Sequence, residues 1–336
     1  MSIACHPLST VRALAVAAGL LCAAAVGAQT LKDPALEALY VADKADELQR
    51  AAQQRLAHQP EDVQAVLALA LAALDRNDTP ARKHALERAE ACAQKQPKAA
   101  PCRYAHGVLL GIQAVAEGVM KAARSAGTVK DALLAAHELE PAWYPARSAL
   151  LEFYLAAPGF MGGSASKAAE LARGAPRPEQ VAALQARVAM QDKRFDTALA
   201  ALAALPPGLE HALATDVQGW GTQAALGAVN AGQAAQAQPF FERLMRDRPG
   251  HAAGAYGLAR VRGELGDWAG ALRLYEQAQG LKDAADWPLA YRMGIALQQL
   301  GRTDEAKAAY KRFVTAGKGQ KASLDDARKR LEQLGG

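Results

Sequence analysis

Three short stretches in the last third of the chain decide the fold. They read GQAAQAQPFFERL (residues 232–244), GDWAGALRLYEQA (residues 266–278) and GRTDEAKAAYKRF (residues 301–313). Each stretch begins with glycine, has alanine at its sixth position and has an aromatic residue at its tenth. They recur at intervals of 34 and 35 residues. A fixed period of this size, without strand-like alternation, predicts an array of helical repeats.

The recurring positions predict how two helices pack within each repeat. Small residues recur at two positions that allow antiparallel helices to approach closely: Ala225 with Ala237, Ala259 with Ala271, and Gly294 with Ala306. Bulky residues that fill the space against the next repeat recur at a third position: Phe241, Tyr275 and Tyr310. Glycines that end the first helix with a positive φ recur at a fourth: Gly232, Gly266 and Gly301. One such pair cannot bury its apolar face alone, so we expect pairs to stack.

This order of apolar, small, glycine, alanine and aromatic positions resembles the tetratricopeptide repeat. The resemblance implies an all-α fold, a right-handed superhelical solenoid of antiparallel helix pairs. The chain is 51% hydrophobic but only 5% aromatic, and its many Ala and Leu residues favour helix over strand. We divide it into a signal peptide (residues 1–28), less regular helical pairs (29–217), three clear repeats (218–320) and a C-terminal capping helix (321–336). In that last helix Leu324, Ala327, Leu331 and Leu334 are expected to face inward.

The first residues have the pattern of a secretory signal. Arg12 precedes an apolar run over residues 13–26, and Val26, Gly27 and Ala28 supply the small residues that a signal peptidase reads. We expect cleavage after Ala28 and a periplasmic location. A membrane anchor is the alternative, but the run is too short for a confident span. We expect no membrane span in the mature chain.

Cys92 and Cys102 are the two cysteines that remain after such cleavage. They flank Gln96 and Pro97, which mark the end of a helix, so the two cysteines are expected at neighbouring ends of consecutive helices. In an oxidising compartment this placement predicts a disulfide. Two buried thiols are the alternative. No second Cys or His pair has metal-ligand spacing, so we expect no metal and no cofactor.

Two segments depart from the repeat. Residues 98–141 are about ten residues longer than one tetratricopeptide-like unit, and we expect helices over residues 102–126 and 129–139 with a turn at Gly127 and Thr128. Residues 157–164 contain a Pro-Gly-x-x-Gly-Gly sequence that resembles a loop of exported bacterial tetratricopeptide proteins. Phe160 and Met161 are apolar at the apparent tip of this loop, which makes them candidate binding residues.

No catalytic constellation is found in the sequence. Ser164 and Lys167 match the S-x-x-K motif of penicillin-binding enzymes, but the S-D-N and K-T-G elements that complete that site are missing. We interpret Ser164 as a helix N-cap. The net charge of +5 is spread along the chain without a dense Lys/Arg block, which argues against nucleic acid as a partner.

The resemblance implies a binding role instead. In tetratricopeptide arrays the first helices line a concave groove, and the family's groove positions carried onto this chain include Asn230, Tyr256, Arg260, Tyr291 and Gln298. A carboxylate clamp needs a fuller Lys/Asn/Arg set, to which only Asn230 and Arg260 correspond.

The sequence therefore predicts a non-enzymatic periplasmic scaffold that binds a protein or peptide in its groove. One alternative is an accessory or ligand-binding component of a periplasmic transporter, which a deep pocket would favour. Another is a hydrolase using the glycine-rich loop, which labelling of Ser164 by an acylating probe would reveal. The sequence specifies neither the partner's identity nor the oligomeric state.

Overall fold

The computed structural model describes residues 29–75 and 78–335, so the expected signal peptide lies outside the described residues. Within these ranges the chain forms 17 α-helices and two short 3-10 helices. The only strand-like pairing in the described part is an isolated bridge between His251 and Lys282. The expected all-α, tetratricopeptide-like fold is confirmed.

Consecutive helices pack against one another as eight pairs followed by a single terminal helix. The first four pairs are α1 (Pro34–Val41) with α2 (Ala45–His58), α3 (Val63–Asp75) with α4 (Thr79–Lys95), α5 (Ala100–Ala116) with α6 (Val119–Leu139), and α7 (Tyr144–Ala156) with α8 (Ala165–Arg173). The last four are α9 (Pro178–Gln191) with α10 (Phe195–Ala203), α11 (His211–Asn230) with α12 (Ala234–Asp247), α13 (Ala252–Glu264) with α14 (Trp268–Gln279), and α15 (Leu289–Gln299) with α16 (Thr303–Ala316); α17 (Lys321–Gln333) ends the array. The 3-10 helices are η1 (Gly159–Met161) and η2 (Ala284–Asp286).

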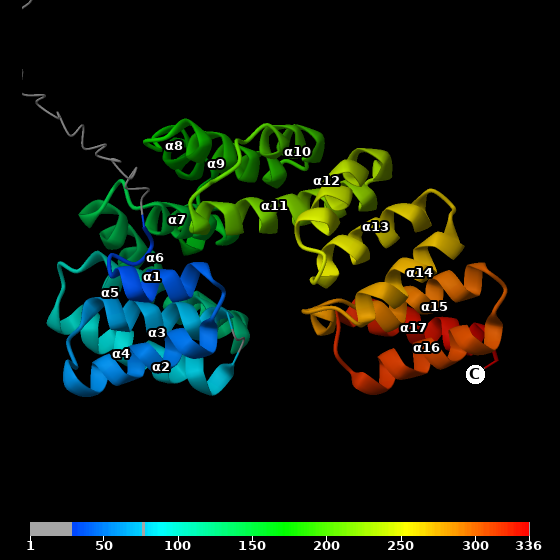
Figure 1. Cartoon of the computed structure of the whole chain (residues 1–336), viewed down its shortest axis with the longest axis horizontal. Coiled ribbons are helices and arrows are strands. Elements are labelled where there is room, and N and C mark those ends of the chain that lie inside the picture. Colours follow the sequence, from blue (N-terminus) through cyan, green and yellow to red (C-terminus); the bar gives the residue numbers. More distant parts are fainter. Residues whose placement is uncertain (1–28, 76–77, 336) are drawn as a thin grey trace, which may run out of the picture.

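The stacked pairs follow a curved path. In Figure 1, α1–α5 lie at one end, α8–α12 pass over the top and α13–α17 lie at the other end. The turn after α1 reaches the middle of the array, where the Asp43 carboxylate lies 3.8 Å from His211 Nε2 and 3.4 Å from Arg248 Nη2. The rings of Tyr40 and His211 meet edge to face, with their centroids 4.6 Å apart. These contacts hold α1 against the start of α11.

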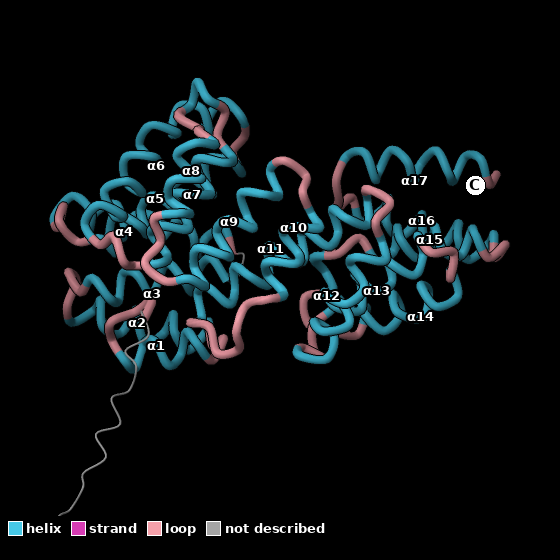
Figure 2. Tube along the Cα trace, turned by 90° about the horizontal axis from the view of Figure 1, so that it is seen from above, coloured by secondary structure: helices cyan, strands magenta, loops and turns pink. Residues whose placement is uncertain are grey.

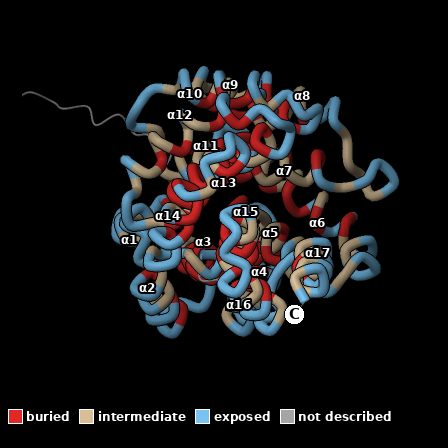
Figure 3. The backbone as a smooth tube through the Cα atoms, turned by 90° about the vertical axis from the view of Figure 1, so that its right-hand side faces the viewer, coloured by how far each residue is buried: buried red, intermediate tan, exposed pale blue. Residues whose placement is uncertain are grey.

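Seen from one end of the array, the buried segments lie between the packed helices (Figure 3). Apolar side chains form three successive clusters, centred on the N-terminal, middle and C-terminal pairs. The bulky repeat residues Phe241 and Tyr310 are fully buried, and Phe241 packs against Gly257 of the following pair. The predicted inter-repeat contact is confirmed at this position.

The expected helix ends and cap are also present. Gly232, Gly266 and Gly301 have φ values of 77°, 85° and 73°, as required where the first helix of each clear repeat turns into the second. In α17, Ala327 is fully buried, and three leucines pack partly buried against the C-terminal cluster: Leu324, Leu331 and Leu334.

The predicted turn at Gly127 and Thr128 is wrong. The chain turns at Glu117 and Gly118, where Gly118 has φ 107°, and α6 runs unbroken through Gly127. A glycine inside a helix costs only about 1 kcal/mol, which the burial of neighbouring apolar residues can offset. The helices α5 and α6 therefore have 17 and 21 residues, against 13 and 9 for α7 and α8.

The helices α4 and α11 each have a well-defined start. The N-cap of α4 is Asp78, whose carboxylate accepts the backbone N–H of Ala81, and Thr79 is the first helical residue. The helix α11 begins at His211 and has 20 residues, so the boundary drawn from the sequence at residue 218 falls inside one helix.

Replacing Gly257 by alanine tests the close packing between repeats. A Cβ at this position would lie 2.0 Å from the Phe241 ring, so Gly257→Ala is expected to lower the free energy of unfolding by about 1–3 kcal/mol. Gly219→Ala in α11 is the matched control, because a Cβ there meets no atom within 4 Å; it should leave stability unchanged or raise it by up to about 1 kcal/mol. Chemical denaturation measures both changes, and equal effects at the two positions would contradict the packing described.

Candidate functional site

Two of the predicted groove residues contact each other. The Arg260 guanidinium donates through Nη2 to Asn230 Oδ1 at 2.7 Å, and the same nitrogen lies 3.9 Å from a Glu264 carboxylate oxygen. Arg260 is buried, whereas Asn230 is exposed. The structure thus places this pair as a bridge between α11 and α13.

The other three groove residues, one on α13 and two on α15, also have partners within the chain. Tyr256 stacks on Trp287 with ring centroids 4.5 Å apart. The Tyr291 hydroxyl donates to Asp326 at 2.8 Å, and Gln298 Oε1 accepts from Tyr310 and from Arg330 at 2.8 and 3.1 Å. Asp326 and Arg330 belong to α17, which therefore covers this part of α15. The binding role of the five groove residues stays a prediction.

The glycine-rich loop forms the short helix η1 and a tight return. Ser164 caps α8, since its hydroxyl accepts the Lys167 N–H at 3.3 Å, and this confirms the structural interpretation of the S-x-x-K match. Only glycine fits at position 163, because a Cβ there would lie 1.7 Å from the Ala157 carbonyl oxygen. The Phe160 side chain is 88% exposed and that of Met161 is half-buried.

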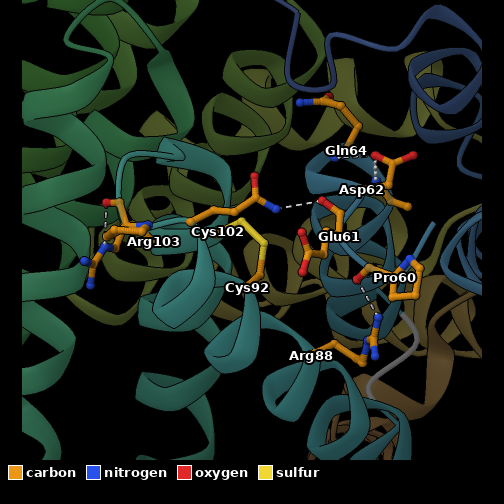
Figure 4. Close-up of a disulfide and its surroundings, with 11 residues drawn as sticks. Pro60, Glu61, Asp62, Gln64, Arg88, Cys92, Cys102 and Arg103 are labelled. Carbon is orange, nitrogen blue, oxygen red and sulfur yellow. Dashed lines mark hydrogen bonds between the residues drawn. A yellow bond between two sulfur atoms is a disulfide. The ribbon is translucent and has the colours of Figure 1, made fainter.

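Cys92 near the end of α4 and Cys102 in the first turn of α5 form the predicted disulfide, with Cα atoms 5.5 Å apart (Figure 4). Both side chains are buried. Close by, Gln96 donates to the Glu61 carbonyl at 2.7 Å and Arg88 donates to the Pro60 carbonyl at 2.8 Å. The disulfide therefore joins α4 to α5, beside hydrogen bonds that connect α4 to the loop between α2 and α3.

The N-terminal half contains a pocket of about 440 Å³. Its walls come from α1, α5, α6, α7 and the start of α11. Aromatic side chains line it (Tyr40, Tyr104, Tyr144 and Phe153) together with aliphatic ones (Val108, Ile112, Val115, Val129 and Leu133). The polar side chains in the lining include Ser148, Glu152, Thr215 and Asp216.

Asp216 is the central polar residue of this pocket. Its Oδ2 accepts hydrogen bonds from the hydroxyls of Tyr144, at 2.8 Å, and Ser148. Its Oδ1 has no hydrogen-bond partner among the described residues and keeps access to solvent. Tyr144 and Ser148 are one turn apart on α7, so a single helix face presents both donors. The arrangement leaves one carboxylate oxygen free to accept from a bound molecule.

The charged groups around Asp216 are already paired with other residues. Arg187 forms a bidentate ion pair with Glu152 at 2.6 and 2.8 Å, and the Trp220 indole N–H donates to the same carboxylate at 2.8 Å. Burial raises the pKa of Asp216 to about 6, and the nearby Glu152 charge acts in the same direction, although the two hydroxyl donors and Arg187 oppose the shift. At neutral pH the pocket therefore contains a carboxylate with no cation of its own.

Two further tyrosines, Tyr40 and Tyr104, line the pocket together with Asp216, at what we call its inner end. Neither the Tyr40 nor the Tyr104 hydroxyl has a hydrogen-bond partner among the residues that the structure describes. Burial raises the pKa of both phenols, and the charge of Asp216, which lines the same pocket, adds to the effect. Both phenols therefore stay protonated and can donate to a ligand.

The outer end of the pocket continues into exposed apolar side chains on the long α5–α6 pair. We call Ile112, Val115, Val119 and Met120 the apolar lip. Val115, Val119 and Met120 are 71%, 82% and 69% exposed, and Ile112 and Val115 also line the pocket. The region around α6 and α8 projects to one side of the array in Figure 2. The lip is thus a partly exposed apolar surface continuous with a recess.

Sequence reasoning missed the pocket residues. Asp216 lies just before the first clear repeat, at the end of the less regular part, and Tyr144 and Ser148 had no feature that separates them from an ordinary helix face. The available signals were an acidic residue within the apolar run of α11 and the i, i+4 spacing of Tyr144 and Ser148. Neither signal says that the two helices meet, because 72 residues separate Tyr144 from Asp216.

Residues 29–75 and 78–335 contain neither a metal-binding cluster nor a membrane-spanning helix. No group of three or more His, Cys, Asp or Glu residues there is arranged to hold a metal ion. None of the helices in the same ranges has the length and apolar character needed to cross a membrane.

The fold is that of a tetratricopeptide-like α-solenoid. No protein-family model matches the chain, and no curated protein matches it in sequence. Among solved structures, the chain is similar to one from the Cut9–Hcn1 hetero-tetramer of the APC/C, with a TM-score of 0.53 and 13% identity over 89% of this chain and 48% of that one. This chain thus spans about half the length of that relative, and at such identity the likeness shows the fold alone.

Two smaller solved chains are also similar. PilF of Pseudomonas aeruginosa has a TM-score of 0.45 and 16% identity, over 68% of this chain and 97% of that one. A tetratricopeptide repeat protein from Parabacteroides merdae ATCC 43184 has a TM-score of 0.43 and 10% identity, over 90% and 96% of the two chains.

Removing the disulfide should destabilise the protein. The bond closes a loop with a sequence separation of 10, which corresponds to about 2.5–3 kcal/mol in the chain-entropy model. The double variant Cys92→Ala, Cys102→Ala is expected to unfold at lower denaturant concentration by that free energy. A reducing agent should destabilise the parent protein and leave the double variant unchanged. Equal stability of the oxidised parent and the variant would contradict the structural role of the bond.

The Asp216 carboxyl predicts a dependence of stability on pH. Its pKa of about 6 in the folded protein lies above the ordinary unfolded value of about 3.9, so between these values the folded state binds more protons. The free energy of unfolding should therefore rise as pH falls from 7 to 5. Relative to Asp216→Asn, the parent protein should gain about 1 kcal/mol over this interval. A stability difference between the two proteins that does not change with pH would rule out this assignment.

Proposed function

We propose that this chain is a non-enzymatic scaffold that binds a protein or peptide segment on its concave side and works in the bacterial periplasm. The observation that carries the proposal is the apolar lip, which leads into the pocket of the N-terminal half. Apolar surface that is exposed beside a recess is typical of interaction sites. The fold supplies a rigid frame for such a surface, since every pair is held by its neighbours.

The contacts of the predicted groove residues support placing the docking surface in the N-terminal half. Arg260 is buried and bonded to Asn230, and Tyr291 is bonded to Asp326 of α17. A ligand at these positions would first have to break existing interactions. Docking on the apolar lip breaks no such interaction, because Val119 and Met120 are mostly exposed.

The mechanism is burial of apolar side chains. A partner segment that covers the lip removes several aliphatic side chains from water, each worth about 1.5–3 kcal/mol when fully buried. Part of this gain offsets the loss of freedom on association, so a few well-covered residues dominate the affinity. We expect a partner segment that presents Leu, Ile, Met or aromatic side chains to the lip.

The periplasmic location rests on separate observations. Residues 12–28 have the pattern of a secretory signal, and a disulfide between Cys92 and Cys102 is favoured in an oxidising compartment. N-terminal analysis of the protein from its bacterial host should show Gln29 as the first residue.

A second candidate function is the ligand-binding component of a periplasmic transport system. The pocket around Asp216 favours it, because a volume of about 440 Å³ lies within the range of small-molecule sites, roughly 300–1,000 Å³.

The docking surface is tested by substitutions on the lip. Val119→Gln with Met120→Gln keeps helix-forming side chains while removing apolar surface, and should weaken capture of the partner at least about tenfold, equivalent to 1.4 kcal/mol. A photo-crosslinking residue at position 119 should trap the same partner in the periplasm. Leu265→Gln is the control, since Leu265 is an exposed apolar residue outside the lip. Unchanged capture by the double variant, or no crosslinked protein from position 119, would contradict the proposal.

A further inference from the structure

We propose that the pocket around Asp216 binds a small organic ammonium ion with an apolar chain, the ammonium on the Asp216 carboxylate and the chain along α5 toward Ile112 and Val115. This site goes beyond the protein-docking role and does not depend on it. The two sites share Ile112 and Val115, but the ammonium group requires Asp216, whereas docking requires the exposed Val119 and Met120.

The first support is the geometry of the carboxylate. Tyr144 and Ser148 both donate to Oδ2, and they hold the Asp216 side chain in one orientation. Oδ1 is left without a partner among the described residues. An ammonium group carries three donors and accepts nothing, so it complements an oxygen that offers only lone pairs. A charge-assisted bond of this kind is stronger than one from a neutral donor.

The second support is the balance of charge. The groups that face Asp216 from neighbouring elements are Tyr40 of α1, Tyr104 of α5, Tyr144 and Glu152 of α7, and Arg187 of α9. Among them, Arg187 is the only cation, and the bidentate pair with Glu152 uses its charge. His211, on α11 itself, lies beside Asp43 instead. A partly buried carboxylate without its own cation is unfavourable, and a bound ammonium would compensate its charge.

The third support is the aromatic lining. Tyr40, Tyr104, Tyr144 and Phe153 all line the pocket. Aromatic faces attract ammonium ions electrostatically when the cation lies within about 6 Å of the ring centre. A carboxylate among several aromatic rings thus selects an organic cation over an anion or a neutral alcohol of the same size.

The fourth support is the apolar path along α5. Tyr104, Val108, Ile112 and Val115 follow one another at spacings of four, four and three residues, so they share one helix face. The 11 steps from Tyr104 to Val115 span about 16.5 Å at 1.5 Å rise per residue. An alkyl chain that starts at Asp216 can therefore lie against this face. Each methylene that it buries should tighten binding by about fourfold.

The binding should depend on pH in a defined direction. Burial raises the pKa of Asp216 to about 6 in the empty pocket, and an ammonium that binds only the carboxylate form lowers it again. Alkylammonium ions keep their proton over this range. Affinity should therefore be constant above pH 7 and fall as the pH decreases below 6.

The experiment is calorimetric titration of the purified protein, beginning at Gln29, with n-hexylammonium chloride at pH 7.5. We expect saturable one-to-one binding, at least tenfold tighter than n-hexanol and tighter again than n-butylammonium. Asp216→Asn should weaken hexylammonium binding at least tenfold, while Asp304→Asn on α16, outside the pocket lining, should not change it. Ile112→Trp keeps the carboxylate and obstructs the path of the chain, so it should remove the preference for hexyl over butyl.

Three outcomes would overturn the proposal. Equal affinities for hexylammonium and hexanol would mean that the pocket is only an apolar recess. The absence of hexylammonium binding to the folded parent protein would exclude the site. If a lysine-containing peptide bound at Asp216 and hexylammonium did not, Asp216 would belong to the docking surface for the protein partner. Val119→Gln with Met120→Gln should leave ammonium binding intact, so failure of the docking proposal and failure of this one are distinguishable.

Discussion

Close contact between antiparallel helices at small residues is the constraint on which the rest of the structure depends. Where alanine or glycine faces the neighbouring helix, two backbones approach, and an aromatic side chain of the pair can reach the next pair. Phe241 does this against Gly257, where no space remains for a Cβ. Each pair still exposes an apolar face, so stability comes from stacking, and the array ends when α17 covers the last face with a polar outer surface.

The candidate site arises where this regular stacking is altered. The helices α5 and α6 are longer than those of the following pair, so their ends extend beyond the stack and present the apolar lip. The helix α11 begins seven residues before the repeat boundary drawn from the sequence, at His211, and this extension brings Asp216 to Tyr144 and Ser148 on α7. The regular repeats build the frame, and the lengthened helices build the pocket.

Local sequence signals predicted the features that depend on neighbouring residues. The all-α class follows from the repeat period and the resemblance it carries, while the glycine turns, the inward face of α17 and the Cys92–Cys102 bond follow from spacing within a few turns of helix. The turn at Gly118 was misplaced because Gly127 and Thr128 look like a stronger break, although packing along α6 outweighs their low helix propensity. The pocket could not be predicted, because it depends on contacts between segments 68 to 72 residues apart.

The covering of α15 by α17 shows the same limit. The groove pattern identifies Tyr291 and Gln298 by their place in the repeat, but it does not say which segment of the chain contacts them. Asp326 and Arg330 fill that role in the structure. A position that faces the groove in a repeat can thus be covered by the chain's own terminal helix, and the start of α11 can supply the more open polar site.

Ring-labelled tyrosine NMR during titration with n-hexylammonium tests most directly whether the altered helices build the binding pocket. The chain has eight tyrosines, which report on both halves of the array in one experiment. The signals of Tyr40, Tyr104 and Tyr144, which line the pocket, should shift together with one affinity, while those of Tyr256, Tyr275, Tyr291 and Tyr310 in the regular repeats stay unchanged. Shifts confined to the repeat tyrosines, or no shifts at all, would contradict the placement of the site.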